Sequence, residues 1–304
     1  MMPPADTLDK LRRLYGDVGA QWIAALPSLI EACAARWSLD LGAPMEVAAF
    51  SALYPARHPD GPRVLKLTVP NPELVSEAAA LRWMADRGAV GLIDADLDRG
   101  ALLLERVEPG TTLYEAVASD DAATRIAARA MARLHAPAPQ AHPFPTLEGW
   151  GRGFARIRAL YGGTSGPIPA DLFEEAERRF AELVATSPEP ALLHGDLHPW
   201  NLLAGPEGAW IVIDPKGVVG DPAAEAACWL RNPMPELLGR PDLERRLARR
   251  LDILADESGL DRDRMLGWGA ALALLSACWN LEDFGEGWAE ATALARAIGQ
   301  GRGS

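Results

Sequence analysis

The part of the chain that most limits its fold spans residues 192–203 and reads Leu-Leu-His-Gly-Asp-Leu-His-Pro-Trp-Asn-Leu-Leu. Apolar pairs stand at both ends of this stretch. A second apolar run, residues 211–213, ends in Asp214, thirteen residues after Asn201. Short apolar runs bounded by Gly and Pro are typical of buried strands joined by tight loops. The pattern predicts strands that hold Asp196, Asn201 and Asp214 at fixed intervals in two polar turns.

These three side chains are of the kinds that phosphoryl transfer requires. One carboxylate orients the attacking hydroxyl, while an amide and a second carboxylate hold Mg²⁺ on the phosphates. Asp196 and Asn201 have the spacing of the protein-kinase catalytic loop, and Asp214 stands where the metal-binding aspartate of a kinase would follow. We therefore interpret Asp196 as the catalytic base, and Asn201 and Asp214 as the metal ligands.

Other interpretations of the same loop compete with this one. His194 and His198 stand at i and i+4, which would suit zinc on a helix, but Gly195 and Pro199 disfavour a helix here. Asp196 taken alone would most often be a turn or capping residue. His194 is better explained as a packed residue that shapes the loop than as a catalyst. The joint occurrence of three suitable oxygen-bearing side chains favours phosphoryl transfer.

Length and composition indicate a globular protein. The chain has 304 residues, enough for one large domain or two modest ones, and its 49% hydrophobic and 24% charged residues are ordinary values. The richest apolar run, residues 267–279, is shorter than the roughly 20 residues of a membrane span. The N-terminus lacks the basic and apolar regions of a secretory signal. We expect no membrane segment and a cytoplasmic protein.

Charge and cysteine content narrow the possible partners. The net charge of −12 disfavours nucleic acid as a partner. It is compatible with a cationic small molecule, and equally with simple solubility. The three cysteines, at positions 33, 228 and 278, are few and widely spaced, which argues for a reducing compartment and against a disulfide framework. Nothing in the composition indicates an oligomeric state.

The form His-Gly-Asp-Leu-His-x-x-Asn at residues 194–201, followed by Ile-Asp, resembles the aminoglycoside phosphotransferase family more closely than protein kinases. Three further segments are similar to the streptomycin 6-kinase and hydroxyurea-kinase branch of that family. They are Glu-Pro-Gly at 108–110, Ile-Asp-Pro-Lys-Gly at 213–217 and Ser-Ala-Cys-Trp-Asn-Leu-Glu-Asp at 276–283. The resemblance covers residues 64–232, and the order of the lobes agrees over nearly the whole chain.

The resemblance implies an α+β fold of the two-lobed protein-kinase-like type. The smaller N-terminal lobe, residues 1–107, would contain an antiparallel sheet and helices. The larger C-terminal lobe, residues 108–304, would be mainly helical and carry the catalytic loop. ATP and Mg²⁺ would be the cofactors. A kinase-like protein that binds a ligand without turnover is the alternative, and the presence of Lys66 beside the three loop residues argues against it.

Lys66 lies in an alternating stretch, residues 63–69, that is typical of a half-buried strand and follows a strong turn signal at 59–62. A solvent-facing lysine would show the same pattern, but the resemblance implies contact with the α- and β-phosphates. No Gly-rich phosphate loop is visible. The turn between the first two strands is expected near residues 41–44 or 48–51.

A helix is expected over residues 71–87, with Pro72 in its first turn. Glu77 in this helix matches the family's carboxylate that pairs with the strand lysine. Glu73 is the competitor, but the helix dipole explains an acidic residue in the first turn. We therefore prefer Glu77 as the partner of Lys66.

Residues 101–107 predict a strand that ends before Pro109-Gly110. The resemblance places the hinge between the lobes at residues 105–110. It implies that backbone groups near Glu105 and Val107 recognise adenine, so the side chains at these positions do not help to predict nucleotide binding.

Helical periodicity is expected over much of the remaining chain. Residues 6–37 predict a helix that Pro27 interrupts, and residues 45–54 predict a strand. Asp221 is read as the structural N-cap of a short helix. The other expected helices cover residues 112–135, 147–161, 171–186 and 241–297.

The acceptor is expected to be streptomycin or a closely similar guanidinium-bearing aminocyclitol. Three observations favour this acceptor: the segments similar to the streptomycin 6-kinase branch, the negative net charge, and a group of C-terminal carboxylates. Guanidinium groups bind well to carboxylates, and the candidates are Glu282, Asp283, Glu286 and Glu290. In the family the acceptor lies between the catalytic loop and the C-terminal helices, so Glu282 and Asp283 are the candidates for contact. The same acids could simply face solvent. Hydroxyurea or another small hydroxylated metabolite is the rival acceptor.

Overall fold

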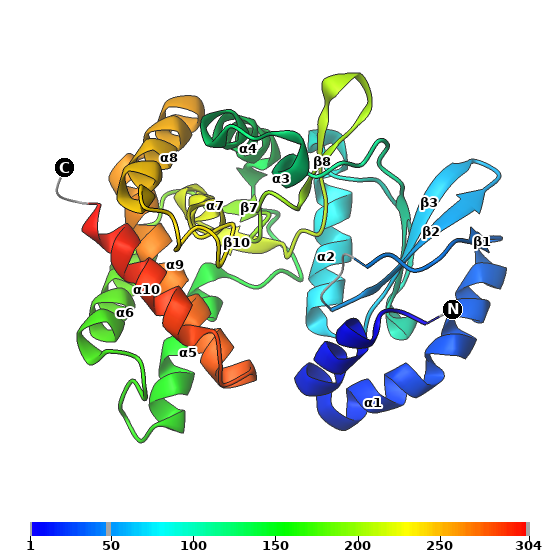
Figure 1. Ribbon diagram of the computed structural model, residues 1–304, viewed down its shortest axis with the longest axis horizontal. Coiled ribbons are helices and arrows are strands. Elements are labelled where there is room, and N and C mark those ends of the chain that lie inside the picture. The colour runs from blue at the N-terminus through cyan, green and yellow to red at the C-terminus, as the bar shows by residue number, and fades with distance from the viewer. Residues whose placement is uncertain (1, 47–49, 302–304) are drawn as a thin grey trace. The chain divides into compact units, whose positions relative to one another are not determined.

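The computed structural model of the chain describes residues 2–46 and 50–301. It consists of two compact units, one that ends at Gly110 and one that begins at Thr111. The smaller unit contains a sheet with helices, and the larger unit is mainly helical (Figure 1). The functional division expected after residue 107 stays a prediction.

An antiparallel sheet of five strands forms the centre of the smaller unit, in the order β1-β2-β3-β5-β4. Its strands are β1 Asp40–Leu41, β2 Ala52–His58, β3 Gly61–Leu67, β4 Leu92–Asp96 and β5 Ala101–Glu105. β2 and β3 form a hairpin around the expected turn, where His58 pairs with Gly61. Lys66 pairs with Leu53 on one side and Leu102 on the other, so it lies in a central strand.

The strand expected over residues 45–54 begins only with β2. Met45 donates a hydrogen bond to the carbonyl of Leu53 at 2.8 Å, so the early part of this run pairs with the later part and does not extend it. Residues 47–49, which contain part of the candidate phosphate turn at 48–51, lie outside the described residues.

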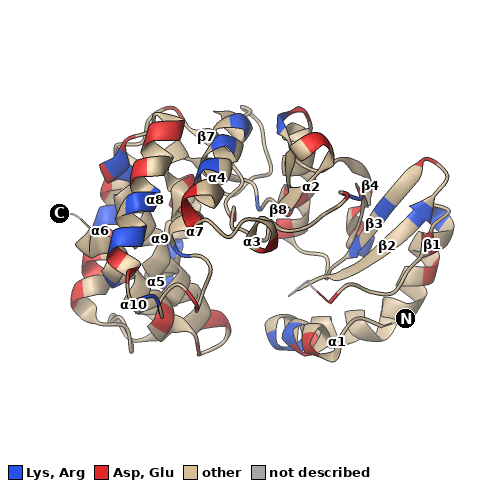
Figure 2. Ribbon diagram, turned by 45° about the horizontal axis from the view of Figure 1, so that its top comes forward, with Lys and Arg blue, Asp and Glu red and all other residues tan. Residues whose placement is uncertain are grey.

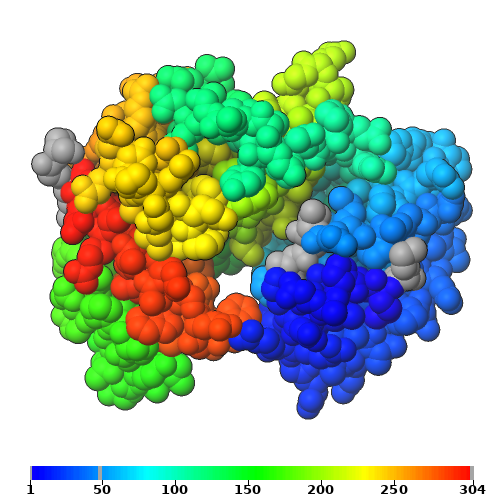
Figure 3. All heavy atoms as spheres, in the orientation of Figure 1, coloured from blue at the N-terminus to red at the C-terminus, as the bar shows by residue number. Residues whose placement is uncertain are grey.

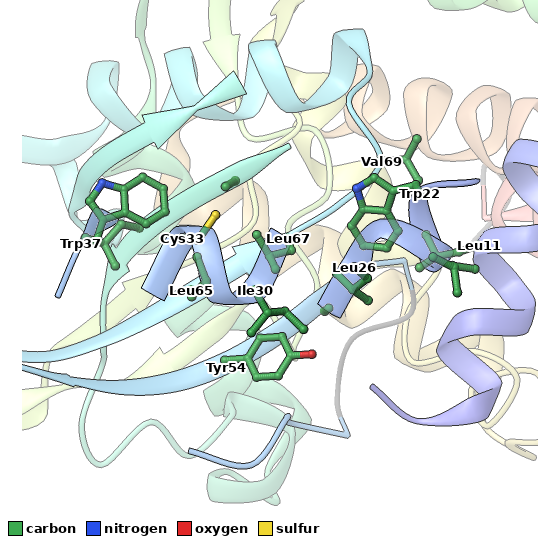
Figure 4. Packing of buried hydrophobic residues seen from close by; sticks show 14 residues of the cluster. Leu11, Trp22, Leu26, Ile30, Cys33, Trp37, Tyr54, Leu65, Leu67 and Val69 are labelled. Atoms are coloured by element: carbon green, nitrogen blue, oxygen red, sulfur yellow. The ribbon is translucent and has the colours of Figure 1, made fainter. Parts of the chain in front are cut away.

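Helix α1, Ala5–Arg36, packs on this sheet through a single apolar cluster that joins it to β2, β3 and β5. Figure 4 shows Leu26 and Ile30 of the helix beside Tyr54 and Leu67 of the strands. Each such fully buried side chain contributes about 1.5–3 kcal/mol to stability. By length and composition α1 is also a candidate membrane span, and 33% of its most apolar 18-residue window is buried inside the protein.

The interruption expected at Pro27 lies at Gly16 instead. Gly16 has φ 54° and ψ −131°, a backbone conformation that residues with a Cβ atom rarely adopt. The helix continues through Pro27, although a proline inside a helix costs about 3 kcal/mol or more. Its neighbours Leu26 and Ile30 are buried against the sheet, and their burial offsets this cost.

Helix α2, Pro72–Trp83, follows the sheet's third strand and begins where the sequence predicts. Asn71 caps it by accepting a hydrogen bond from the Leu74 N–H at 3.0 Å. After α2 a short 3-10 turn, Ala85–Arg87, follows and ends at Gly88, whose φ of 92° is left-handed. Glu77 lies on the buried face of α2 and is 6% exposed.

Helix α9, Arg262–Asp283, is the centre of the larger unit. The helices α5 Leu147–Leu160, α6 Ala170–Ala185, α7 Ala226–Leu230, α8 Leu243–Ser258 and α10 Trp288–Gln300 contact it. A Cβ atom at Gly267 would lie 2.9 Å from Arg179 of α6, and one at Gly269 would lie 2.7 Å from Leu230 of α7. These two glycines therefore allow the close approach of both neighbours.

Two of the expected helices are divided in the structure. The first becomes α3 Leu113–Ala116 and α4 Asp120–Leu134, because Ser119 caps α4 by accepting from the Ala122 N–H at 3.3 Å. The stretch 241–297 becomes α8, α9 and α10. Left-handed glycines, Gly259 with φ 70° and Gly287 with φ 74°, separate these three helices.

An ion-pair network joins α4 to α8, whose basic residues are blue in Figure 2. Arg250 is 2% exposed and donates to Asp120 Oδ1 at 2.6 Å. It also donates to the carbonyls of Trp229 at 3.0 Å and Asn232 at 2.6 Å. Burial raises the pKa of Asp120, but its bonds and charge contacts with Arg250 and Arg246 outweigh this and hold the pKa below its usual range. Arg250 therefore fixes the chain immediately after α7.

Candidate active site

Short strands position the polar loop in the larger unit. β7, Ala191–Leu193, pairs with β10, Val218–Gly220, while β8, Leu202–Ala204, pairs with β9, Trp210–Val212. The loop between β7 and β8 contains Asp196 and Asn201, and Asp214 follows β9. The Ile213 N–H donates to the Asn201 carbonyl at 3.1 Å. The structure thus brings the two predicted polar turns together in one hydrogen-bonded unit.

His194 is fully buried and shapes this loop. Its Nε2 lies 2.9 Å from the carbonyl oxygen of Ile213, and a carbonyl only accepts, so Nε2 carries the proton. Its Nδ1 accepts from the Asp196 N–H at 3.1 Å. The neutral imidazole is therefore bonded at both nitrogens, as a structural residue would be. Within residues 2–46 and 50–301, His, Cys, Asp and Glu side chains form no group of three that could hold a metal ion.

Glu225 holds the start of the loop from the opposite side. It is 2% exposed, and its two carboxylate oxygens accept from the backbone N–H groups of His194 at 2.6 Å and Gly195 at 3.0 Å. Burial raises the pKa of Glu225, but its neighbours His135 and Gly195 help to lower it more, so the pKa lies below the usual range. Sequence reasoning missed this role. The one available signal was an acidic residue inside the apolar segment 223–230.

Asp196 lies beside a thiol and several charged side chains, and its role as the base stays a prediction. Its side chain is 25% exposed, and its Oδ1 accepts from the thiol of Cys228 at 3.2 Å and lies 3.7 Å from Arg231 Nη2. Burial raises the pKa of Asp196, but nearby charges, led by that of Lys216, outweigh this and hold the pKa below its usual range. The carboxylate is therefore ionised at neutral pH. Neither Cys228 nor Arg231 was expected at this position from the sequence.

Asn201 and Asp214 are the predicted metal ligands, and that role stays a prediction. Asn201 is 6% exposed, and its Nδ2 donates to the backbone carbonyl of Asp196 at 3.0 Å, so the amide nitrogen is engaged within the protein. Asp214 has φ 59°, a left-handed conformation that non-glycine residues rarely adopt and that is concentrated at functional sites. Carboxylate and amide oxygens are ligands that Mg²⁺ accepts in proteins.

Lys66 and Glu77 form a buried ion pair in the smaller unit. Lys66 Nζ lies 2.7 Å from Glu77 Oε1, and both side chains are less than 10% exposed. Glu73 lies in the first turn of α2, as the dipole argument expected. A buried pair of this kind carries a desolvation cost, so it is weak evidence for a gain in stability. Contact of Lys66 with phosphates stays a prediction.

In the expected hinge, some backbone N–H groups already form hydrogen bonds within the protein. The Glu105 N–H donates to the Gly91 carbonyl at 2.8 Å, and the Arg106 N–H donates to the Pro62 carbonyl at 3.3 Å. Recognition of adenine near Glu105 and Val107 stays a prediction, and it would have to use the other backbone groups of this segment.

Glu282 and Asp283 lie at the end of α9 and are exposed. Glu282 accepts from Arg156 Nε at 2.7 and 2.9 Å, so its charge is already paired inside the protein. Burial, followed by the charge of Glu282, raises the pKa of Asp283. Contact of these two acids with an acceptor stays a prediction.

Asp221 has the structural role expected from the sequence. Its side chain caps the turn that follows by accepting from the Ala223 N–H, and it also accepts from the Trp268 indole N–H at 2.6 Å.

The fold and the loop together define a small-molecule kinase of the protein-kinase-like class. Residues 36–284 match the family described as aminoglycoside/hydroxyurea antibiotic resistance kinase. The chain belongs to this family, and the α+β fold class and the kinase activity expected from the sequence are thereby confirmed.

Relatives and solved structures agree with this assignment. The chain is 34% identical to the streptomycin 6-kinase of Streptomyces glaucescens, over 89% of this chain and 88% of that protein. It is 33% identical to the hydroxyurea phosphotransferase of Kitasatospora aureofaciens, over 92% and 80%. The choline kinase of Streptococcus pneumoniae has the same fold, with a TM-score of 0.66, 15% identity and coverage of 90% and 99%. An aminoglycoside phosphotransferase of Streptomyces rimosus, solved with ADP and streptomycin, has a TM-score of 0.58, 23% identity and coverage of 84% and 98%.

Proposed function

We propose that the chain transfers the γ-phosphate of ATP, with Mg²⁺, to a hydroxyl group of a small-molecule antibiotic. Streptomycin or a similar guanidinium-bearing aminocyclitol is the first acceptor to test. The observation that supports the proposal is the loop itself: the Asn201 side chain donates to the Asp196 carbonyl, and the Asn201 carbonyl accepts from the N–H of Ile213, the residue directly before Asp214. The cysteines described in the structure are buried free thiols, which supports a reducing, cytoplasmic location.

In this proposal the acceptor oxygen forms a bond to the γ-phosphorus, and the bond from that phosphorus to the β–γ bridging oxygen of ATP breaks. The hydroxyl proton goes to Asp196. Cys228 and Arg231 both contact Oδ1 of this carboxylate, so we assign the hydroxyl to Oδ2. An ionised carboxylate held in this way contributes by positioning the acceptor and by accepting its proton.

The other predicted residues would bind the cofactors. Asn201 and Asp214 would hold Mg²⁺, which when bound neutralises charge on the phosphates. Lys66, oriented by Glu77 at 2.7 Å, would contact the α- and β-phosphates. Backbone groups near Glu105 and Val107 would contact adenine.

Replacement of Asp196 by Ala tests this proposal. ADP formation should fall by about 10² or more, the usual scale for a lost general base, while ATP binding and the melting temperature stay near those of the wild type. Asp171→Ala, which removes an exposed carboxylate on α6, is the matched control and should keep full activity. An Asp196→Ala variant with near-full turnover would exclude this residue as the base.

Hydroxyurea is the second candidate acceptor. Relatives that are named for streptomycin and for hydroxyurea have almost the same identity to this chain, so identity does not separate them. The pairing of Glu282 with Arg156 weakens the case for an acidic wall.

A further inference from the structure

One oxygen of the Asp196 carboxylate, Oδ1, is engaged inside the protein. It accepts from the thiol of Cys228 at 3.2 Å, and Arg231 Nη2 lies 3.7 Å from the same atom. The second oxygen, Oδ2, is the one assigned above to the acceptor hydroxyl. The last torsion of an aspartate is soft, with broad and roughly two-fold minima, so the plane of the carboxylate turns easily. The direction of Oδ2 therefore depends on what holds Oδ1.

The Cys228 thiol is held in a fixed place from which to donate. Cys228 belongs to α7 and is 3% exposed, whereas the segment after α7, yellow in Figure 3, lies at the surface of the larger unit. Asn232 of this segment donates through Nδ2 to the Cys228 carbonyl at 2.9 Å and to Sγ at 3.5 Å. The Asn232 carbonyl in turn accepts from the buried Arg250 at 2.6 Å. The sulfur thus accepts from Asn232 and donates its own proton to Asp196.

The thiol stays protonated at neutral pH. Burial raises the pKa of Cys228 well above its usual value, an effect that the Arg231 guanidinium opposes and the Asp196 charge reinforces. Cys228 is therefore a hydrogen-bond donor and not a nucleophile. Because an S–H group is a weak donor, it orients the carboxylate while it withdraws less charge from the oxygen than a hydroxyl would.

Cys228 complements Glu225, which holds the backbone of the same loop. The two residues are three positions apart on consecutive helical turns, so their side chains lie on one face. Glu225 accepts from the N–H groups of His194 and Gly195, and Cys228 contacts the side chain of the next residue, Asp196. Three consecutive loop residues are thus anchored to one short stretch, and the thiol is the contact that reaches the carboxylate itself.

We propose that Cys228 is a positioning residue for phosphate transfer, which fixes the plane of the Asp196 carboxylate so that Oδ2 faces the acceptor hydroxyl. This inference rests on the function proposed above, because it needs Asp196 as the base. Small errors in the position of a reacting group cost large factors in rate. Loss of the thiol should therefore lower kcat, while the KM for ATP, whose proposed contacts are made by other residues, stays near that of the wild type.

The first test measures ADP formation by the wild type, Cys228→Ala and Cys228→Ser with streptomycin and with hydroxyurea. Cys228→Ala should lower kcat about tenfold, the lower end of the scale for one hydrogen bond to a charged group, because a thiol is a weak donor. Cys228→Ser keeps a donor and should recover most of the rate. Cys278→Ala is the matched control, because it removes another buried thiol of the larger unit, on α9, and should keep kcat and KM.

A double-mutant cycle separates positioning from a contribution to stability alone. If Cys228 acts through Asp196, the variant that carries both Cys228→Ala and Asp196→Ala should be no slower than Asp196→Ala. A thiol that only stabilised the fold would add its cost in both backgrounds. Urea unfolding of each variant shows which of them are folded under the conditions of the assay.

Infrared spectroscopy tests the contact without turnover. The S–H stretching band of Cys228 is assigned by its loss in Cys228→Ala. In Asp196→Ala the thiol proton loses its acceptor, so this band should move to higher frequency. The band of Cys278 should not move.

Three results would overturn the inference: a wild-type kcat in a folded Cys228→Ala variant, an equal loss of rate in the Asp196→Ala background, or an S–H band that does not respond to Asp196→Ala. Near-full turnover in Asp196→Ala would instead overturn the proposed base and this inference with it, so the two failures are distinguishable. If the wild type phosphorylates neither acceptor, the proposed function fails for these compounds, and the infrared band alone decides whether Cys228 orients Asp196.

Discussion

Replacement of Glu225 by Gln tests how the catalytic loop is held. In the wild type both carboxylate oxygens accept from loop amides, at 2.6 Å from the His194 nitrogen and 3.0 Å from the Gly195 nitrogen. Glutamine keeps one acceptor oxygen and places an NH₂ group against the other N–H, so one bond is lost and a buried donor is left without an acceptor. The Asp196 carboxylate follows directly after these two residues, so its position depends on the same contact.

The magnitude follows from the number of bonds. A hydrogen bond to a charged group contributes about 1.5–3 kcal/mol, and relief of the burial cost of the carboxylate offsets part of the loss. We expect Glu225→Gln to lower the free energy of unfolding by about 2 kcal/mol, and Glu225→Ala, which loses both bonds, by about 3–5 kcal/mol. For a unit of this size, about 2 kcal/mol corresponds to a fall in melting temperature of about 4–8 °C.

The dependence on pH gives a second readout. The folded-state pKa of Glu225 lies below its usual value of 4.5. The contribution of the Glu225 carboxylate to the free energy of unfolding is therefore complete above pH 4.5, and it is lost as the pH falls through the folded-state pKa. Scanning calorimetry should show the largest difference between wild type and Glu225→Gln at pH 7, and a smaller one at pH 4.

Activity and a matched control complete this experiment. Displacement of Asp196 should lower kcat by about tenfold or more, because small errors in position cost large factors in rate. Glu236→Gln changes an exposed glutamate nearby and should alter neither property. Equal melting temperatures for wild type and Glu225→Gln, or a difference that does not depend on pH, would refute the assigned role.

Three further predictions concern the other sites. Asp214→Ala should abolish detectable phosphate transfer and Asn201→Ala should raise the Mg²⁺ concentration needed for half-maximal rate; activity that persists in a chelator contradicts both roles. Lys66→Met should raise the KM for ATP without unfolding the smaller unit, and Glu77→Gln should do so more mildly, whereas a larger effect of Glu73→Gln would show that the wrong partner was chosen. Asp120→Asn should lower the free energy of unfolding by about 2 kcal/mol, less than the ~3–5 kcal/mol for a fully buried pair because the Asp120 side chain is 21% exposed; an unchanged urea midpoint would count against the network.

The features that the sequence predicts well are those that depend on spacing within one segment. Asp196 and Asn201 are five positions apart in one loop, and the capping of α2 by Asn71 is equally local. The ion pair of Lys66 with Glu77 joins a strand to the next helix, only eleven positions along the chain.

The features that the sequence leaves undetermined depend on contacts between distant segments. Glu225 reaches back to an amide 31 positions earlier, and the partner of Glu282 is Arg156, 126 positions away. Neither pairing has a local pattern. The continuation of α1 through Pro27 likewise depends on Leu26 and Ile30, which are buried against a sheet that follows later in the chain.

The network around Arg250 links a helix surface to the surroundings of Asp196. Arg250 holds the carbonyls of Trp229 and Asn232, and these residues flank Arg231 in the sequence. Arg231 Nη2 in turn lies 3.7 Å from Asp196 Oδ1. A substitution at Asp120, on α4, would therefore displace Arg231 and change the charge environment of Asp196 without altering any residue of the loop itself.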